Sequence, residues 1–222
     1  MTRRIISSFI LNLFVTVVFA QVTKLPLKEW NSTPDKPFVF YISGDGGYTS
    51  FSDSLCGQIN KAGYKVIALN SNSYFYDKKT PQQTSRDIVN CLNSQFGKRK
   101  NQQFVLAGYS FGADIVPFVV NNLPDSVRKK MVSVVLLSPS TSTDFETHFW
   151  DMLGWKKKRS MDVMAEVNKM GLQKTAIIFG TSEDDFPVSS IKLKNYSSEK
   201  LPGGHRYDGN TNEVAKTMMK YF

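Results

Sequence analysis

The chain has 222 residues, of which 41% are hydrophobic, and it carries 28 Lys and Arg against 19 Asp and Glu. This length predicts one domain with one substantial core and leaves little room for two full domains. The formal charge of +9 favours contact with anionic lipid headgroups or polyanions, although solubility alone would also account for it. The two cysteines, Cys56 and Cys91, allow at most one disulfide.

The first 20 residues have the pattern of a secretory signal peptide. Arg3 and Arg4 precede an apolar segment over residues 5–19, and Ala20 is a small residue at the expected cleavage point. The apolar segment is short for a membrane span, which makes an uncleaved anchor the weaker alternative. We therefore expect export and removal of residues 1–20, followed by an N-terminal lead over residues 21–36.

After this lead, apolar runs of strand length alternate with helical patterns. The predicted strands cover residues 38–42, 64–69, 104–107, 132–137, 175–179 and 196–201. The predicted helices cover residues 51–62, 80–96, 113–122, 162–170 and 212–222. Such alternation is typical of a mostly parallel sheet with helices on both faces, so the predicted fold class is α/β. Cys56 and Cys91 then lie on opposite faces of the sheet, and we expect two free, buried thiols.

Residues 141–170 depart from the alternation and are predicted to form a small lid insertion. Trp150 and Trp155 stand beside a basic run over residues 156–159. Tryptophans next to lysines suit a lipid–water boundary, and a solvated helix end packed through its indoles is the alternative.

Residues 104–114 carry the strongest functional signal. An apolar run ends in Gly108-Tyr109-Ser110-Phe111-Gly112, and a helical pattern follows. Strand, sharp turn and helix in this order form the context of a Gly-x-Ser-x-Gly nucleophile elbow, where side chains at the glycine positions would collide with backbone. Ser110 is therefore the candidate nucleophile, and an ordinary glycine-containing turn is the alternative.

A serine nucleophile needs an imidazole to take its proton and a carboxylate to orient that imidazole. His205 lies in a glycine-rich loop after the last predicted strand, and the acidic run Glu183-Asp184-Asp185 follows the strand over residues 175–179. The chain order serine, acid, histidine is that of α/β-hydrolases. Asp184 is the first choice for the acid, with Asp185, Glu183 and Asp144 as alternatives.

The loop over residues 43–47, Ser-Gly-Asp-Gly-Gly, directly follows the first predicted strand. It lacks the lysine and spacing of a phosphate-binding Walker motif. In an α/β-hydrolase this position contributes to the oxyanion hole, so we expect the backbone N–H groups of Asp45, Gly46 and Phe111 to form one. The two histidines, His148 and His205, are widely separated and no His-x-x-x-His or paired-cysteine pattern occurs, so neither a metal nor another cofactor is expected.

Several longer motifs resemble the VirJ/AcvB family of bacterial virulence proteins. They are Gly44-Asp45-Gly46-Gly47, Thr80-Pro81-Gln82-Gln83-Thr84, Gly108-Tyr109-Ser110-Phe111-Gly112-Ala113-Asp114 followed by Pro117-Phe118, Asp144-Phe145-Glu146 with His148, and Leu201-Pro202-Gly203-Gly204-His205 with Asp208-Gly209. The resemblance runs from about Pro37 to the C-terminus and lacks the additional N-terminal portion of AcvB-like proteins. It implies a periplasmic α/β-hydrolase domain over residues 37–222.

The resemblance also implies a substrate and partners. AcvB-like members are implied to hydrolyse aminoacyl-phosphatidylglycerol, chiefly its lysyl form, and VirJ-like members are linked to type IV secretion. A small-molecule or lipid ester, an anionic membrane surface and secretion-system proteins are therefore the expected partners, with no direct binding of nucleic acid. Because an aminoacyl ester carries a free ammonium, the acidic residues Asp114, Asp144, Glu146 and Asp208 are candidates for binding it. His148 is a further candidate, either for contact with the substrate or for stabilising the lid. A periplasmic binding or chaperone protein without turnover is the alternative function.

Overall fold

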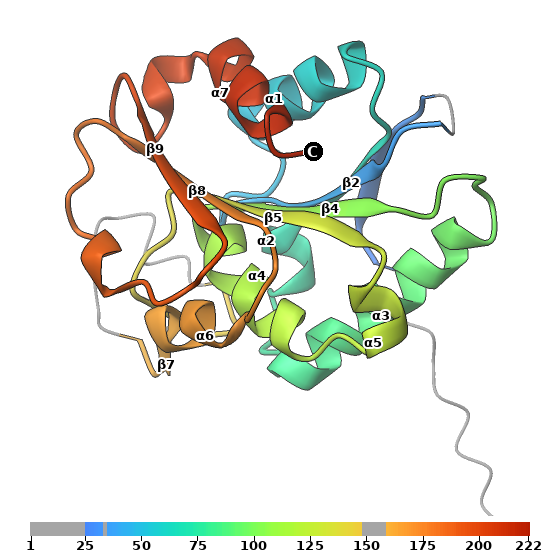
Figure 1. Ribbon diagram of the computed structural model, residues 1–222, viewed down its shortest axis with the longest axis horizontal. Helices are drawn as coiled ribbons and strands as arrows, with labels where there is room; N and C mark the ends of the chain where they lie inside the picture. The colour runs from blue at the N-terminus through green and yellow to red at the C-terminus, as the bar shows by residue number, and fades with distance from the viewer. Residues whose placement is uncertain (1–24, 33–34, 148–158) are drawn as a thin grey trace, which may run out of the picture.

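The computed structural model describes residues 25–32, 35–147 and 159–222. They form three layers, in which one seven-stranded sheet lies between two layers of helices (Figure 1). The strand order is β1-β3-β2-β4-β5-β8-β9. β1 is antiparallel to β3, and every other neighbouring pair in this sheet is parallel. The predicted signal peptide lies outside the described residues.

The strands and helices follow the predicted alternation closely. The sheet consists of β1 (Leu27–Trp30), β2 (Phe38–Ile42), β3 (Val66–Leu69), β4 (Phe104–Tyr109), β5 (Met131–Leu137), β8 (Thr175–Gly180) and β9 (Tyr196–Leu201), and a separate pair consists of β6 (Ser142–Thr143) and β7 (Met161–Asp162). The helices are α1 (Ser50–Lys61), α2 (Ser71–Tyr74), α3 (Pro81–Phe96), α4 (Phe111–Asn121), α5 (Asp125–Arg128), α6 (Val163–Lys169) and α7 (Thr211–Met219), with 3₁₀ turns η2 (Val188–Ser190) and η3 (Tyr207–Gly209).

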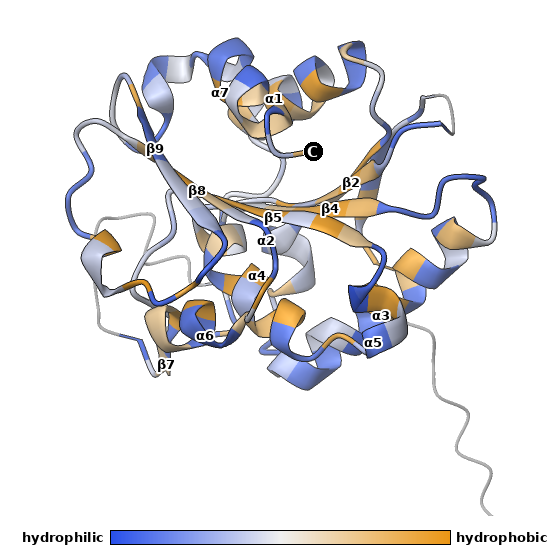
Figure 2. Ribbon diagram, in the orientation of Figure 1, coloured by the Kyte–Doolittle hydropathy of each residue, from blue (hydrophilic) through white to orange (hydrophobic). Residues whose placement is uncertain are grey.

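Two apolar cores lie on the two faces of the sheet. α1 and α7 cover one face, and α3, α4 and α6 cover the other (Figure 1). Along β2, Val39 and Tyr41 belong to the first core, whereas Phe38, Phe40 and Ile42 belong to the second. The central strands are therefore apolar on both faces, and Figure 2 shows them as a hydrophobic band between helices with polar outer surfaces. This double burial explains why continuous apolar runs in the sequence mark the strands.

Polar caps fix where the longer helices begin. The Thr49 side chain accepts a hydrogen bond from the Ser52 N–H at the start of α1, and the Thr80 side chain accepts one from the Gln83 N–H at the start of α3. Pro81 occupies the first turn of α3, where its missing N–H costs nothing. None of the described helices is long and apolar enough to cross a bilayer.

Three features differ from the sequence-based expectations. β1 lies inside the predicted lead and extends the sheet by an antiparallel edge strand. α6 falls within the predicted lid, but its Val163 and Val167 are buried in the core on the face that α3, α4 and α6 cover. Residues 148–158 of that insertion lie outside the described residues. The two thiols are free on opposite faces as expected, but Cys91 is only partly buried, unlike Cys56.

Candidate active site

Ser110 connects the end of β4 to the start of α4, in the geometry of a nucleophile elbow. Its backbone has φ 52° and ψ −121°, a conformation that costs a non-glycine residue roughly 1–3 kcal/mol. A Cβ on Gly108 would lie 2.4 Å from the Gly112 carbonyl oxygen, and a Cβ on Gly112 would lie 2.1 Å from the Ile42 carbonyl oxygen. Only glycine fits at these two positions, and the turn that they permit presents the Ser110 hydroxyl at the carboxyl end of the sheet.

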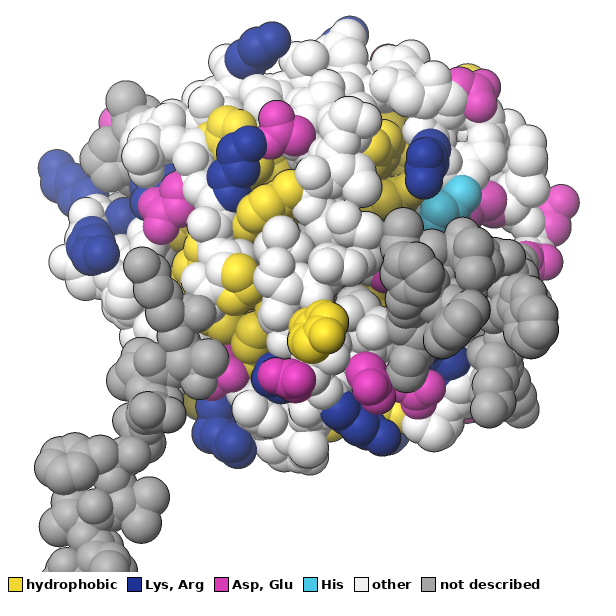
Figure 3. Space-filling model, turned by 180° about the vertical axis from the view of Figure 1, so that it is seen from behind, with side chains coloured by type: hydrophobic (Ala, Val, Ile, Leu, Met, Phe, Trp, Pro, Cys, Tyr) yellow, Lys and Arg dark blue, Asp and Glu magenta, His cyan; other side chains and the backbone are white. Residues whose placement is uncertain are grey.

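His205 reaches Ser110 from the loop after β9, 95 residues further along the chain. Its Nε2 lies 2.8 Å from Ser110 Oγ. The Tyr109 hydroxyl, adjacent to the elbow serine, donates to the His205 carbonyl oxygen at 3.1 Å and so fixes the histidine loop against β4. The imidazole is half exposed and reaches the molecular surface (Figure 3). This geometry allows His205 to accept the Ser110 proton while the site stays open to substrate.

The carboxylate that contacts His205 is Glu183, whereas the sequence favoured Asp184. Glu183 Oε1 lies 2.7 Å from His205 Nδ1, and the Glu183 side chain is 19% exposed. Asp184 points outward, is 83% exposed, and pairs with Lys200 at 2.7 Å. The turn after β8, in which the Glu183 N–H donates to the Gly180 carbonyl, directs the first acidic side chain inward and the second outward. The choice of Asp184 is therefore wrong, and Glu183 takes its place.

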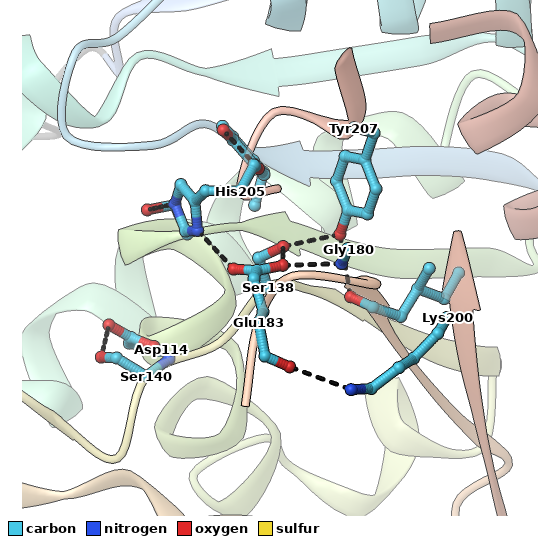
Figure 4. Close-up of polar contacts among 11 residues, drawn as sticks. Asp114, Ser138, Ser140, Gly180, Glu183, Lys200, His205 and Tyr207 are labelled. Atoms are coloured by element: carbon cyan, nitrogen blue, oxygen red, sulfur yellow. Dashed lines mark hydrogen bonds and ion pairs between the residues drawn. The ribbon is translucent and has the colours of Figure 1, made fainter. Parts of the chain in front are cut away.

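Glu183 is held by donors on both of its oxygens (Figure 4). His205 faces Oε1, while the Ser138 hydroxyl and the Gly180 N–H both donate to Oε2 at 2.7 Å. Burial alone would raise the pKa of Glu183, but the hydrogen bonds from His205, Ser138 and Gly180 outweigh it and hold that pKa below its usual value. The carboxylate is thus ionised at neutral pH, as is needed to orient and stabilise an imidazolium.

Two of the three expected oxyanion donors belong to residues that line the site. Phe111 is the first residue of α4, where a backbone N–H has no partner within the helix, and both Phe111 and Asp45 line the pocket over Ser110. The Gly46 N–H instead donates to the Asp45 carboxylate at 2.8 Å. We therefore retain Phe111 and Asp45 as candidate oxyanion donors and correct the expectation for Gly46.

A polar pocket of about 140 Å³ opens beside Ser110 and His205. Its charged lining consists of Asp45, Asp114, Glu146 and Arg159, besides His205. Asp114 is buried one turn beyond Ser110 on α4, and its carboxyl oxygens accept the N–H and the hydroxyl of Ser140, both at 2.6 Å. Burial raises the pKa of Asp114 to about 7, against the lowering effect of the Ser140 hydrogen bonds. The small volume and polar lining suit a short polar group better than a long apolar chain.

The remaining predicted site residues are dispersed. Asp144 accepts hydrogen bonds from Ser160 and pairs with Arg159, so it ties two segments together and does not contact the imidazole. Asp185 is exposed on the loop that follows Glu183. Asp208 is exposed and packs against Gly203, and it is not among the residues that line the pocket. His148 lies outside the described residues.

Sequence reasoning missed three residues that the fold brings to the site: Ser138, Ser140 and Tyr207. Ser138 directly follows β5, the strand beside β4, so its position at the carboxyl end of the sheet was a usable signal. Tyr207 follows His205 by two residues, and nothing in the sequence indicates that its hydroxyl contacts Ser138 and the Ile178 carbonyl of β8. Figure 4 shows Ser138 between Glu183 and Tyr207, and Ser140 against Asp114.

Comparison with known proteins identifies the family and the fold. Residues 35–222 match the family described as bacterial virulence protein (VirJ). Similar solved structures include Est1E from Butyrivibrio proteoclasticus with ferulic acid bound (16% identity, 88% of this chain and 95% of that chain, TM-score 0.59) and a monoacylglycerol lipase from Paleococcus ferrophilus (14%, 90% and 100%, 0.61). Another is MGS-MChE2, an α/β-hydrolase from a lagoon-sediment metagenome (16%, 90% and 95%, 0.64). No curated protein matches significantly. The fold is that of the α/β-hydrolases.

Proposed function

The chain belongs to the bacterial virulence protein (VirJ) family, and we propose that it is a serine hydrolase that cleaves a carboxylic ester. The observation that carries this proposal is the unbroken contact from Ser110 Oγ through the two ring nitrogens of His205 to Glu183, at 2.8 and 2.7 Å. A similar solved structure is described as a monoacylglycerol lipase, which supports ester cleavage on this fold.

In the proposed reaction, Ser110 Oγ attacks the ester carbonyl carbon while His205 Nε2 accepts the hydroxyl proton. Glu183 stays ionised, holds Nδ1–H and stabilises the imidazolium. The Phe111 and Asp45 N–H groups stabilise the oxyanion. The alcohol then leaves with the proton from His205, and a water molecule, deprotonated by the same imidazole, cleaves the acyl-enzyme to the carboxylic acid and returns the hydroxyl of Ser110.

For the substrate, we propose an aminoacyl ester, such as that of lysyl-phosphatidylglycerol. Three acidic side chains, Asp45, Asp114 and Glu146, line the pocket beside Ser110 against one basic residue, Arg159. An acyl group that carries a free ammonium would meet a carboxylate there, and a short polar acyl group suits the volume of the pocket.

Export to the periplasm remains a prediction from residues 1–20, to be tested by fractionating cells that express the full chain.

The test measures labelling of purified protein by a fluorophosphonate probe and release of lysine from vesicles that contain lysyl-phosphatidylglycerol. Ser110→Ala should abolish labelling and lower turnover by at least about a thousandfold, whereas Ser126→Ala, at an exposed serine on α5, should match the wild type. Absence of labelling in the wild type would favour the binding or chaperone function instead. Labelling and cleavage of simple esters without lysine release would retain the hydrolase and reject the aminoacyl substrate.

A further inference from the structure

Strained backbone is concentrated around the proposed catalytic residues. In the part of the chain that the structure describes, the non-glycine residues with positive φ are Ser110 (52°), Ser138 (49°), Tyr207 (51°) and Asp208 (49°). Such conformations persist only where surrounding contacts enforce them, and they cluster at functional sites. The elbow explains Ser110. Ser138 and Tyr207 are outside the serine, histidine and acid set, so their strain needs another explanation.

A buried chain of hydroxyl groups supplies that explanation. The Ser138 hydroxyl donates to Glu183 Oε2 at 2.7 Å, and the Tyr207 hydroxyl lies 2.7 Å from Ser138 Oγ. Because the Ser138 proton is directed to Glu183, the single proton of the Tyr207 hydroxyl is shared between Ser138 Oγ and the Ile178 carbonyl oxygen, which lies 2.8 Å away and places the ring beside β8. Ser138 is 2% exposed and Tyr207 1% exposed, so water has little access to replace either hydroxyl.

The length of the glutamate side chain explains why such support matters. Glutamate has one more rotatable bond than aspartate, so contact of one oxygen with His205 fixes its carboxylate poorly unless the other oxygen is also held. In this protein Oε2 is held by the Ser138 hydroxyl and the Gly180 N–H. Ser138 makes this contact from a backbone with a left-handed φ of 49°.

We infer that Ser138, and Tyr207 acting through Ser138, are positioning residues that hold Glu183 in the orientation that serves His205. This inference rests on the proposed serine hydrolase function. It has a quantitative consequence: because Tyr207 acts through Ser138, the loss of both hydroxyls should cost no more than the loss of the Ser138 hydroxyl alone.

The experiment measures the second-order rate of fluorophosphonate labelling as a function of pH. Ser138→Ala should slow labelling by about tenfold to a hundredfold, the scale of one hydrogen bond to a buried charge. Tyr207→Phe should slow it less, and the double variant should match Ser138→Ala. Ser138→Gly should also slow labelling, although glycine relieves the strain at positive φ. This variant therefore separates the effect of losing the hydroxyl from the effect of the strained backbone. Ser133→Ala is the matched control, because Ser133 is buried on β5, the strand that Ser138 directly follows, and its hydroxyl has no hydrogen-bond partner.

A second readout separates positioning from stability alone. The Ser138 hydroxyl favours ionised Glu183, so its removal should move the acidic limb of the labelling profile to higher pH, whereas lower stability alone would change only the melting temperature. If the wild type fails to label, the proposed function falls. If the wild type labels and Ser138→Gly keeps its rate and pH profile, the hydroxyl is not needed and the inference is overturned. Additive losses in the double variant would overturn the link through Tyr207.

Discussion

Replacing Asp114 by asparagine should stabilise the protein increasingly as the pH rises. Asp114 is buried, and its burial raises its pKa from 3.8 to about 7 despite two hydrogen bonds from Ser140. An asparagine at this position reproduces the protonated acid, because its oxygen can accept the Ser140 N–H and its amide can donate to the Ser140 hydroxyl. The variant therefore keeps the contacts of the neutral form and never acquires the buried charge.

The sign and size of this stability difference follow from the linkage between proton binding and folding. A carboxyl whose pKa is raised on folding contributes stability that is fully present below the unfolded pKa of 3.8 and is lost as the pH rises through about 7. A shift of this size corresponds to about 4 kcal/mol over the whole range. Between pH 5 and pH 8 the wild type should lose about 2–3 kcal/mol relative to Asp114→Asn, since groups unaffected by the substitution cancel in the comparison.

The assay is urea unfolding of both proteins at several pH values, with Asp208→Asn as the control for loss of a carboxylate at an exposed position. Asp114→Asn and the wild type should differ least at the acidic end of the series. A difference that stays constant from pH 5 to pH 8, or that favours the wild type at high pH, would refute the reasoning that Asp114 bears an unfavourable buried charge.

Two further predictions test the site and the elbow. Glu183→Gln should lower kcat/KM for an ester by roughly 10³–10⁴-fold, because an amide cannot hold the imidazole in the required tautomer. The kcat/KM of Asp184→Asn should stay within about twofold of the wild type. A larger loss in Asp184→Asn than in Glu183→Gln would identify Asp184 as the acid. Gly112→Ala should lower the free energy of unfolding by more than about 3 kcal/mol in denaturant unfolding, since its Cβ would collide with the backbone of β2. Gly57→Ala in α1 has open space around its Cβ and should raise that free energy by about 0.5–1 kcal/mol. Similar effects at both glycines would contradict this account.

Local sequence determined the framework of the protein. Double burial of the central strands makes them continuous apolar runs, so the strand order along the chain could be predicted with only small shifts at the ends. The nucleophile elbow could also be predicted from local sequence, because glycine is required at positions 108 and 112 by steric contacts within one turn and with one neighbouring strand. β1 was missed since an edge strand of four residues, with both central residues exposed, has no apolar run to mark it.

Tertiary structure alone decided which acid serves His205. Glu183, Asp184 and Asp185 are neighbours in sequence with similar chemistry, and their side-chain directions depend on the turn after β8, which sends Glu183 to the imidazole and Asp184 to Lys200. Tertiary structure also decided which hydroxyl groups support Glu183, because Ser138 and Tyr207 are 69 residues apart and meet only where the end of β5 and the loop after β9 converge. Residue types and short turns are set by local sterics, whereas contacts between distant loops exist only after the parallel sheet has brought the ends of its strands together.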